Sequence, residues 1–495
     1  MPRDTHVVVS PNAQIFAHFR DVVYTVIAAR DRGRRRRRDL LQCKVPMANI
    51  LPFRALRYDP ARVRLAHVLT QPYDKITPQM QDHYYDASPY NLVRIILGKR
   101  EPGDRPGNDV YSRAAQCFHD WRRDGILAQD AEPAIYAYSQ LFRAPGQGEE
   151  LERWGFIGLG RIEDYSAGVV FRHEQTLAKP KADRLELLRA TRGHFGQIFM
   201  LYEDTGNIEA RLKSQATPDI EVRDEYSVLH RVWRISDRDT VAFVREQMRD
   251  KRLIIADGHH RYETALTYRN ERRTAHGAAA GANSGISVSR DTANAPYHIA
   301  PYEYVMMTFI NMNARGLLIL PTHRVVHSLP SFSAGTFATK AGKYFELQEV
   351  SGSVDPQRLT EMLRDAGRAG TALLAVTQDR IFLLKNPKPA AEEIFQGLSS
   401  QQRELDVVQL HRCLVEGVLA LSEESIRNQQ NISYVRDASE ALQKVRTGNV
   451  NAVFLMNPAR MQQVRDIAFA GEVLPQKSTD FYPKLLSGLT IYALE

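Results

Sequence analysis

The sequence has 495 residues, of which 43% are hydrophobic and 25% charged, and this composition excludes a chain that is disordered or fibrous throughout. Its formal net charge of +8 is typical of a protein with a polyanionic partner such as nucleic acid. The charge is concentrated, however, because residues 1–46 carry ten basic and four acidic residues, a net +6, and all later residues together carry +2. We therefore expect no extended basic face on the folded part of the chain.

The basic N-terminal extension, residues 1–46, is centred on five consecutive arginines, Arg34 to Arg38. Runs of like charge are usually solvated and disordered. Aromatic side chains do not interleave with these arginines, so nucleic acid is expected to bind at most weakly, through residues 30–44. An apolar-rich segment begins at Met47, which makes this residue a candidate initiator. In that case residues 1–46 are not translated.

The cysteines and the apolar runs indicate a reducing compartment and no membrane partner. Cys43, Cys117 and Cys413 lie far apart and form no C-x-x-C pair, which argues against a disulfide framework and a zinc knuckle. The longest apolar runs have about eight residues, whereas a membrane-spanning helix needs roughly 20. We predict a cytoplasmic protein, and the sequence leaves its oligomeric state open.

Strand and helix patterns alternate from residue 47 onward, which predicts a mixed α/β (α+β) fold. Residues 47–215 are expected to form an N-terminal mixed α/β domain. Its strands are expected at 134–139 and 155–162, and its helices at 110–123 and 182–192.

Two further segments complete the predicted organisation. Residues 216–328 carry the densest polar chemistry and are interrupted at 276–294 by an Ala-, Gly-, Ser- and Asn-rich stretch, which we interpret as a flexible loop. Residues 329–495 are expected to form a C-terminal α/β domain. Its strands are expected at 372–376, 381–384, 432–435 and 452–456, and its main helices at 406–421 and 460–469.

The most informative motif is a strand-to-helix junction, where an apolar strand over residues 253–256 is followed by a polar turn and a helical pattern. Free backbone N–H groups and the helix dipole favour an anion at such a junction, and a glycine lets the ligand approach the backbone closely. Histidine and arginine add charge-assisted donors that suit phosphate, and an aspartate at the strand end can hold Mg²⁺ beside it. The residues of this predicted site are Asp257, Gly258, His259, His260 and Arg261. The alternative is that the histidines only cap the helix.

Two other polar clusters are candidate parts of the same site. His173-Glu174 begins the first, but Leu177 stands where H-E-x-x-H needs its second histidine, so a zincin is excluded. This cluster, which ends at Arg184, is either part of a site or solvated charge on a loop. The second cluster, residues 475–484, combines aromatic residues with lysines, and we select Lys477 from it. Walker, Rossmann and G-x-S-x-G motifs are absent from the sequence.

Six motifs in one order resemble the bacterial family called domain of unknown function 1015, and the resemblance runs from about Ile50 to the C-terminus. The motifs are Gln71-Pro72-Tyr73-Asp74, His173-Glu174 with Asp183-Arg184, Asp257-Gly258-His259-His260-Arg261, Tyr302-Glu303-Tyr304-Val305-Met306-Met307, Leu320-Pro321-Thr322-His323-Arg324, and Lys477-Ser478-Thr479 with Phe481-Tyr482-Pro483-Lys484.

Within that family, the Asp-Gly-His-His-Arg element resembles the nucleotide-binding helix start of the ParB/sulfiredoxin superfamily and the Asp-Gly-His-x-Arg of free serine kinases. The resemblance implies a ParB/sulfiredoxin-like nucleotide-binding core with additional mixed α/β segments. It implies that Gly258, His260 and Arg261 contact phosphates and that Asp257 assists a metal or the phosphoryl transfer. His259 stands where sulfiredoxin has its reactive cysteine, which disfavours repair of cysteine sulfinate.

The function that this resemblance implies is a Mg²⁺-assisted phosphotransferase that uses ATP or ADP and acts on a small hydroxyl metabolite, with free L-serine as the first candidate. The alternatives are a non-catalytic nucleotide or metabolite sensor and a nucleotide hydrolase that drives a conformational change. The candidate catalytic residues are Asp257, His260, Asp74 and Glu174, with the last two as possible bases. The other candidate nucleotide-binding residues are His259, His173, Arg184 and Lys477.

Overall fold

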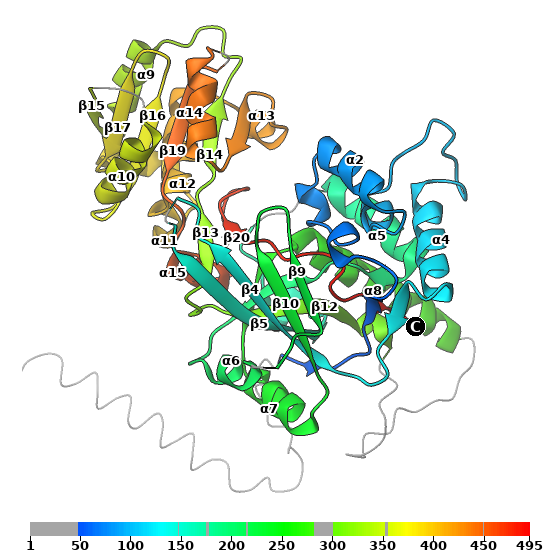
Figure 1. The fold of residues 1–495 in the computed structure, drawn as a ribbon. Helices are drawn as coiled ribbons and strands as arrows, with labels where there is room; N and C mark the ends of the chain where they lie inside the picture. The colour runs from blue at the N-terminus through cyan, green and yellow to red at the C-terminus, as the bar shows by residue number, and fades with distance from the viewer. Residues whose placement is uncertain are drawn as a thin grey trace, which may run out of the picture. The chain divides into compact units, whose positions relative to one another are not determined.

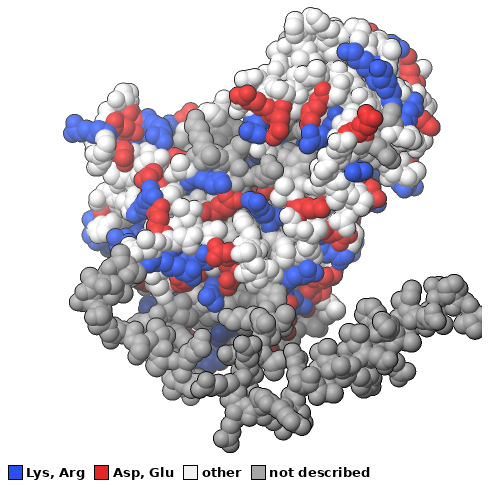
Figure 2. All heavy atoms as spheres, turned by 180° about the vertical axis from the view of Figure 1, so that it is seen from behind, with Lys and Arg blue, Asp and Glu red and all other residues white. Residues whose placement is uncertain are grey.

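The computed structural model describes residues 48–495 except 147, 175–177, 214–215, 282–299, 352–354 and 449. The basic extension and Met47 lie outside these described residues. Within the described ranges, no helix is both long and apolar enough to cross a membrane. Figure 2 shows basic and acidic side chains interspersed on one face, which agrees with the low net charge of residues 47–495.

The larger of the two main sheets has nine strands (Figure 1). The strands are β1 (Ile50–Leu51), β4 (Ile135–Arg143), β5 (Glu150–Arg161), β6 (Val170–Phe171), β8 (Ile198–Tyr202), β9 (Ile220–Arg223), β10 (Leu229–Ile235), β11 (Leu253–Asp257) and β12 (Tyr304–Asn311). Their order is β6-β11-β8-β12-β5-β4-β10-β9, with β1 beside β5. The pairs β6/β11 and β8/β12 are parallel, and the other pairs are antiparallel. The boundary that the sequence predicts between residues 215 and 216 falls inside this sheet.

Helices and short paired strands surround the nine-stranded sheet. The helices are α2 (Pro78–Ala87), α3 (Val93–Ile96), α4 (Val110–Arg123), α5 (Ala178–Thr191), α6 (Asn207–Leu212), α7 (Arg238–Met248) and α8 (His259–Gly281), with 3-10 turns η1 (Leu65–His67), η2 (Tyr73–Lys75), η3 (Tyr165–Ala167) and η4 (Pro301–Glu303). The short pairs are β2 (Leu56–Tyr58) with β3 (Leu127–Gln129), β7 (Gly193–His194) with β21 (Tyr492–Ala493), and β13 (Leu318–Leu320) with β20 (Asp480–Tyr482).

A six-stranded sheet lies in residues 323–456, and all its pairs are antiparallel. Its strands are β14 (His323–Val326), β15 (Glu346–Glu349), β16 (Ala372–Val376), β17 (Ile381–Lys385), β18 (Ile432–Val435) and β19 (Ala452–Met456), in the order β15-β17-β16-β19-β14-β18. The helical elements from residue 334 onward are α9 (Ala334–Ala341), α10 (Pro356–Ala366), η5 (Pro389–Phe395), α11 (Ser400–Arg403), α12 (Asp406–Gln409), the π-helix η6 (Leu410–Val418), α13 (Glu423–Arg427), α14 (Ala438–Arg446) and α15 (Met461–Phe469).

Several predicted elements are confirmed residue for residue, namely the helix over 110–123 and the strands over 372–376, 432–435 and 452–456. The mixed α/β fold class is confirmed as well. The prediction of a flexible loop at 276–294 is wrong for its first residues, because α8 continues to residue 281. Residues 282–294 of that loop lie outside the described residues.

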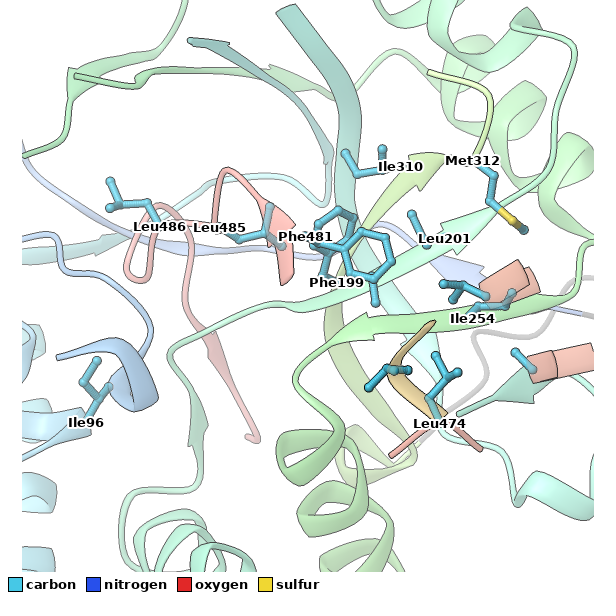
Figure 3. Packing of buried hydrophobic residues seen from close by; sticks show 14 of the residues in the cluster. Ile96, Phe199, Leu201, Ile254, Ile310, Met312, Leu474, Phe481, Leu485 and Leu486 are labelled. Atoms are coloured by element: carbon cyan, nitrogen blue, oxygen red, sulfur yellow. The ribbon is translucent and has the colours of Figure 1, made fainter. Parts of the chain in front are cut away.

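The C-terminal end of the chain packs on one face of the nine-stranded sheet, as Figure 3 shows. Side chains alternate along a strand, so Phe199 and Leu201 of β8 face this side, whereas Met200 faces the other. Phe481 stacks edge-on against Phe199 with ring centroids 5.7 Å apart, and Leu485 joins the same apolar cluster. Each such buried side chain contributes about 1.5–3 kcal/mol. This packing fixes the backbone on both sides of the polar residues described next.

Candidate functional site

The predicted junction between strand and helix is present at the end of β11. Apolar residues keep β11 inside the sheet up to Ala256, and α8 begins at His259. Gly258 joins the two with φ at +89°, a backbone conformation that suits glycine. Tyr262 N–H donates to the Gly258 carbonyl (2.9 Å), which closes the first turn of α8. The first turn of α8 therefore starts two residues after Asp257.

Two cations flank the Asp257 carboxylate. Arg261 Nη2 donates to Oδ2 (3.1 Å), and Lys484 Nζ lies 3.7 Å from Oδ1. Burial alone would raise the pKa of Asp257, but Lys484 and Arg261 outweigh burial and hold that pKa well below its usual range. The carboxylate is therefore ionised at neutral pH.

A second carboxylate, Asp480, extends the cluster through Lys484. Lys484 Nζ lies 2.9 Å from Asp480 Oδ1, and Lys75 Nζ lies 3.9 Å from the same oxygen. Arg436 Nε contacts Oδ2 at 2.6 Å. Burial opposes ionisation of Asp480, yet Lys484 and Lys75 lower its pKa. Asp257 and Asp480 in turn raise the pKa of Lys484 against the effect of burial.

These six residues form what we call the cation cluster, and its charges do not balance. Within the cluster, four cations face two carboxylates, a net +2; Arg436 is its exposed member, and Asp74, outside the cluster, raises the pKa of Lys75. Burial, followed by repulsion from Lys484, lowers the pKa of Lys75 to about 8. A bound anion would relieve this repulsion. The cluster consists of Lys75, Asp257, Arg261, Arg436, Asp480 and Lys484.

His260 lies on the partly exposed side of the same helix start. Burial lowers the pKa of this imidazole, and nearby Glu263 and Asp74 oppose that effect, while Lys181 and Lys477 add to it. Asp74 is exposed in η2, and Lys477 is exposed at a left-handed φ of +58°. The structure thus gathers the predicted residues Asp74, His260 and Lys477 around the helix start.

His173, His259 and Glu174 lie deeper and hold the C-terminal loop. His173 is buried, and its Nδ1 donates to the Ile255 carbonyl (2.7 Å) while Nε2 lies 2.7 Å from Thr479 Oγ1. Thr479 N–H donates to Glu174 Oε1 (3.2 Å). The His259 ring is buried with its centroid 4.8 Å from that of His173. Adjacent helix residues point about 100° apart, so His259 faces inward and His260 outward.

Arg184 lies on the other side of Arg261, beside an apolar hollow. Its guanidinium stacks over the Tyr73 ring at 4.3 Å, and its Nε donates to Asp183 (3.0 Å). Arg184 and Arg261 both line a hollow of about 70 Å³, together with Leu187 and other apolar side chains. Ligand pockets usually measure roughly 300–1,000 Å³, so this hollow is too small for a whole nucleotide.

The donors available for Mg²⁺ are few. Among the described residues, no group of three or more His, Cys, Asp or Glu side chains could hold a metal ion. The chemistry of Mg²⁺ nevertheless fits one carboxylate combined with phosphate oxygens and waters. Asp257 is the carboxylate next to the helix start, so a metal would have to share it with Arg261 and Lys484.

Sequence reasoning missed four members of the cation cluster: Lys75, Arg436, Asp480 and Lys484. Lys75 directly follows the Gln-Pro-Tyr-Asp motif, and Asp480 and Lys484 lie in the cluster at 475–484, from which only Lys477 was selected. Arg436 lies outside all the predicted motifs. The available signal was the density of charge among apolar residues at 480–486, since charged side chains are rarely buried unless they are paired.

Replacing Gly258 with alanine is expected to weaken nucleotide binding as well as stability. A Cβ there would lie 2.9 Å from Arg261 Nη2 and would displace the guanidinium. Gly206 offers a matched control, because its φ is +100° but nothing lies within 4 Å of a Cβ. Both substitutions should cost about 1–2 kcal/mol for the left-handed backbone. Thermal melts and nucleotide titrations of both variants test this, and equal nucleotide affinity in the two would contradict it.

Comparison with known proteins places the chain in a family. The model of the family described as "Protein of unknown function (DUF1015)" matches residues 50–408. No curated protein matches the chain.

Solved structures show low overall likeness to this chain. A conserved hypothetical protein from Pyrococcus furiosus is 12% identical with a TM-score of 0.32, and the match covers 66% of this chain and 92% of that one. Free serine kinase in complex with AMP is 13% identical with a TM-score of 0.30, covering 65% and 88%. SbnI with a C-terminal truncation from Staphylococcus aureus is 9% identical with a TM-score of 0.31, covering 67% and 87%.

Proposed function

Because the chain belongs to the DUF1015 family, whose description names no activity, we propose from the site itself that the protein is a nucleotide-dependent phosphotransferase acting on a small hydroxyl compound. The observation that supports this proposal is the net +2 of the cation cluster at the start of α8. Helix N-termini and charge-assisted Arg and Lys donors are the common protein partners of phosphate groups. The negative charge of a di- or triphosphate would balance the net +2 of the cation cluster, which favours ATP or ADP as the phosphate donor.

The residues divide into a phosphate-binding group and a candidate base. The N–H groups after Gly258, with Arg261 and Lys484, would hold the terminal phosphates and neutralise the charge that they carry during transfer. Mg²⁺ held by Asp257 and phosphate oxygens would add to that neutralisation.

Asp74 is our preferred general base. It is exposed and acts electrostatically on His260, whereas the Glu174 carboxylate is already bonded to Thr479. In the proposed step, Asp74 accepts the proton of the substrate hydroxyl, and the substrate oxygen bonds to the terminal phosphorus. The bond from that phosphorus to the bridging oxygen breaks, and the nucleotide leaves with one phosphate fewer. Free L-serine is the first acceptor to test, on the resemblance of the Asp-Gly-His-His-Arg element.

The Asp74→Asn variant is expected to lose turnover by about 10²–10⁴-fold while it still binds nucleotide, because asparagine cannot accept the proton. The assay mixes the protein with ATP or ADP, Mg²⁺ and a panel of hydroxyl amino acids, and detects phosphorylated product by mass spectrometry. Asp86→Asn, an exposed aspartate of α2, is the control and should leave turnover unchanged.

Three results would contradict parts of the proposal. Nucleotide binding without product from any acceptor would indicate a sensor. Release of inorganic phosphate that no acceptor increases would indicate a hydrolase. Full turnover in Asp74→Asn would exclude this residue as the base.

A further inference from the structure

A polar hollow of about 250 Å³ lies in the C-terminal part of the chain, and none of the residues that line it belongs to the cation cluster. Its walls come from the start of β16, the end of β19 and the N-termini of α12 and α15. The start of β16 and the end of β19 lie at one edge of the six-stranded sheet, because the two strands are antiparallel and Leu373 pairs with Met456. The lining residues used below are Thr371, Glu404, Asp406, Asn457, Arg460 and Ser478.

Asp406 is the central group of this hollow, and its close partners are all neutral. The Ala372 N–H, the Thr371 hydroxyl and the Asn457 amide act on the carboxylate, and each lowers its pKa. The Asn457 amide donates to the Leu363 carbonyl (3.1 Å), which fixes the amide in place. Among the described residues, no cation lies within ion-pair distance of Asp406. Burial nevertheless raises the pKa of Asp406 to about 7.

Arg460 is the cation that faces Asp406 across the hollow. Its charge lowers the pKa of Asp406, so the two groups interact electrostatically, yet no ion pair within 4.0 Å joins them in the described part of the chain. Arg460 is exposed at the N-terminus of α15. The hollow thus presents an unpaired carboxyl group and an unpaired guanidinium with a space between them.

Glycine at position 367 supports this arrangement. A Cβ on Gly367 would collide with the Asn457 amide, so the glycine leaves room for this amide, which lines the same hollow as Asp406. The hollow is smaller than the roughly 300–1,000 Å³ of pockets for drug-sized ligands, which excludes a nucleotide and fits a compound of a few heavy atoms.

We propose that this hollow binds a small zwitterion of the α-amino-acid class, whose ammonium group pairs with Asp406 and whose carboxylate pairs with Arg460. An ammonium group supplies the positive charge that the partners of Asp406 lack, and a guanidinium is the usual partner of a carboxylate. The proposal concerns a site separate from the start of α8 and does not depend on the proposed function. Ser478 lines the hollow, while its neighbour Thr479 contacts Glu174, so one loop borders both sites.

The test titrates the full chain with each of the twenty L-amino acids by isothermal calorimetry at pH 8. For the amino acid that binds, its N-acetyl derivative and its decarboxylated amine are titrated next. Both analogues should bind at least about 30-fold more weakly, since each loses one charge pair. Asp406→Asn and Arg460→Gln should weaken binding of the amino acid to a similar extent. Arg460 is exposed, so its variant keeps the test valid if Asp406→Asn fails to fold.

The pH dependence supplies an independent measurement. Only ionised Asp406 pairs with the ammonium group, so affinity should rise about tenfold between pH 6 and pH 8. The charged groups that face Asp406 are Arg460, which keeps its charge over this range, and the hollow's other carboxylate, Glu404, which is exposed. Arg460→Gln should retain this dependence, and Asp406→Asn should abolish it.

Two control variants separate this site from the others. Glu404→Gln should leave binding unchanged, and loss of binding there would overturn the assignment to Asp406. Arg261→Ala should also leave it unchanged, because that residue belongs to the candidate phosphate site. Binding lost in Arg261→Ala but kept in Asp406→Asn would place the amino acid at the start of α8 and overturn the proposal. Absence of binding by all twenty amino acids would overturn it as well.

Discussion

Replacing Arg261 with alanine is expected to weaken binding of ATP or ADP by at least about 30-fold. Arg261 is the cation that the first turn of α8 places beside Asp257, and the neighbouring backbone holds it, because Nη1 donates to the Gln197 carbonyl. Its side chain is only 15% exposed, so water screens its charge less than that of a surface arginine. Isothermal calorimetry at constant ionic strength measures the change.

Arg273→Ala is the matched control for this variant. Arg273 lies on the same helix, is exposed and pairs with Glu303, so its loss changes helix propensity to the same extent but leaves the helix start intact. Arg261→Lys should recover part of the affinity, because it restores the charge without the planar fork. Equal affinity of Arg261→Ala and Arg273→Ala for nucleotide would mean that the phosphate site lies elsewhere.

The Lys484→Met variant is expected to lower Tm by about 3–5 °C. Lys484 is 9% exposed and contacts both Asp257 and Asp480, so the substitution takes one cation from each of these largely buried carboxylates and leaves Arg261 beside Asp257 and Arg436 beside Asp480. Removing one partner of a buried ion pair costs about 3–5 kcal/mol. An unfolding entropy of roughly 2 cal/mol/K per residue makes each kcal/mol equal to about 1 °C in a chain of this length. Differential scanning calorimetry measures Tm.

The loss of Tm in Lys484→Met should depend on pH in a defined direction. The folded pKa values of Asp257 and Asp480 lie below the unfolded value of about 3.9, so their contribution to stability is present above that pH and is lost as pH falls toward the folded values. Without Lys484, burial raises both folded pKa values. The difference in Tm between wild type and variant should therefore be largest near pH 7 and smaller at pH 4.

Two further variants test the cause of this loss. Lys444 is a surface lysine that pairs with Glu440, and Lys444→Met should change Tm little. Adding Asp480→Asn to Lys484→Met should restore part of the lost stability, since it removes one of the two carboxylates that lost the Lys484 partner. A double variant less stable than Lys484→Met would contradict the ion-pair explanation.

The junction at Asp257–Arg261 could be predicted because its causes are local. The junction consists of four apolar residues of β11, a glycine and a helical pattern, which are contiguous in the sequence. The sequence therefore predicts both the strand-to-helix geometry and the polar residues that lie there. The same reason explains why helix 110–123 and the short apolar strands of the second sheet were predicted well. The roles proposed for Asp74, His260 and Lys477 remain predictions, although the structure brings these residues to the same helix start.

His173 and Glu174 show the opposite case. Their pattern predicts polar groups near a site. In the structure, His173 instead forms hydrogen bonds with the Ile255 carbonyl and with Thr479. Glu174 accepts a hydrogen bond from Thr479, which lies near the far end of the chain. The sequence does not indicate whether a polar side chain will contact a ligand or another loop of the protein, because that depends on which segments the sheet brings together.

The sequence alone determined the family, the mixed α/β class and the strand-to-helix junction at the start of α8, because periodicity and contiguous motifs specify local structure. Only the tertiary structure decided the charge around that junction. Lys75 and Lys484 come from opposite ends of the described chain, and they meet because apolar residues such as Phe481 must be buried against the nine-stranded sheet. Burial brings together residues that are far apart in the sequence. The overall charge of +8 therefore could not reveal the small surplus of positive charge in the cation cluster.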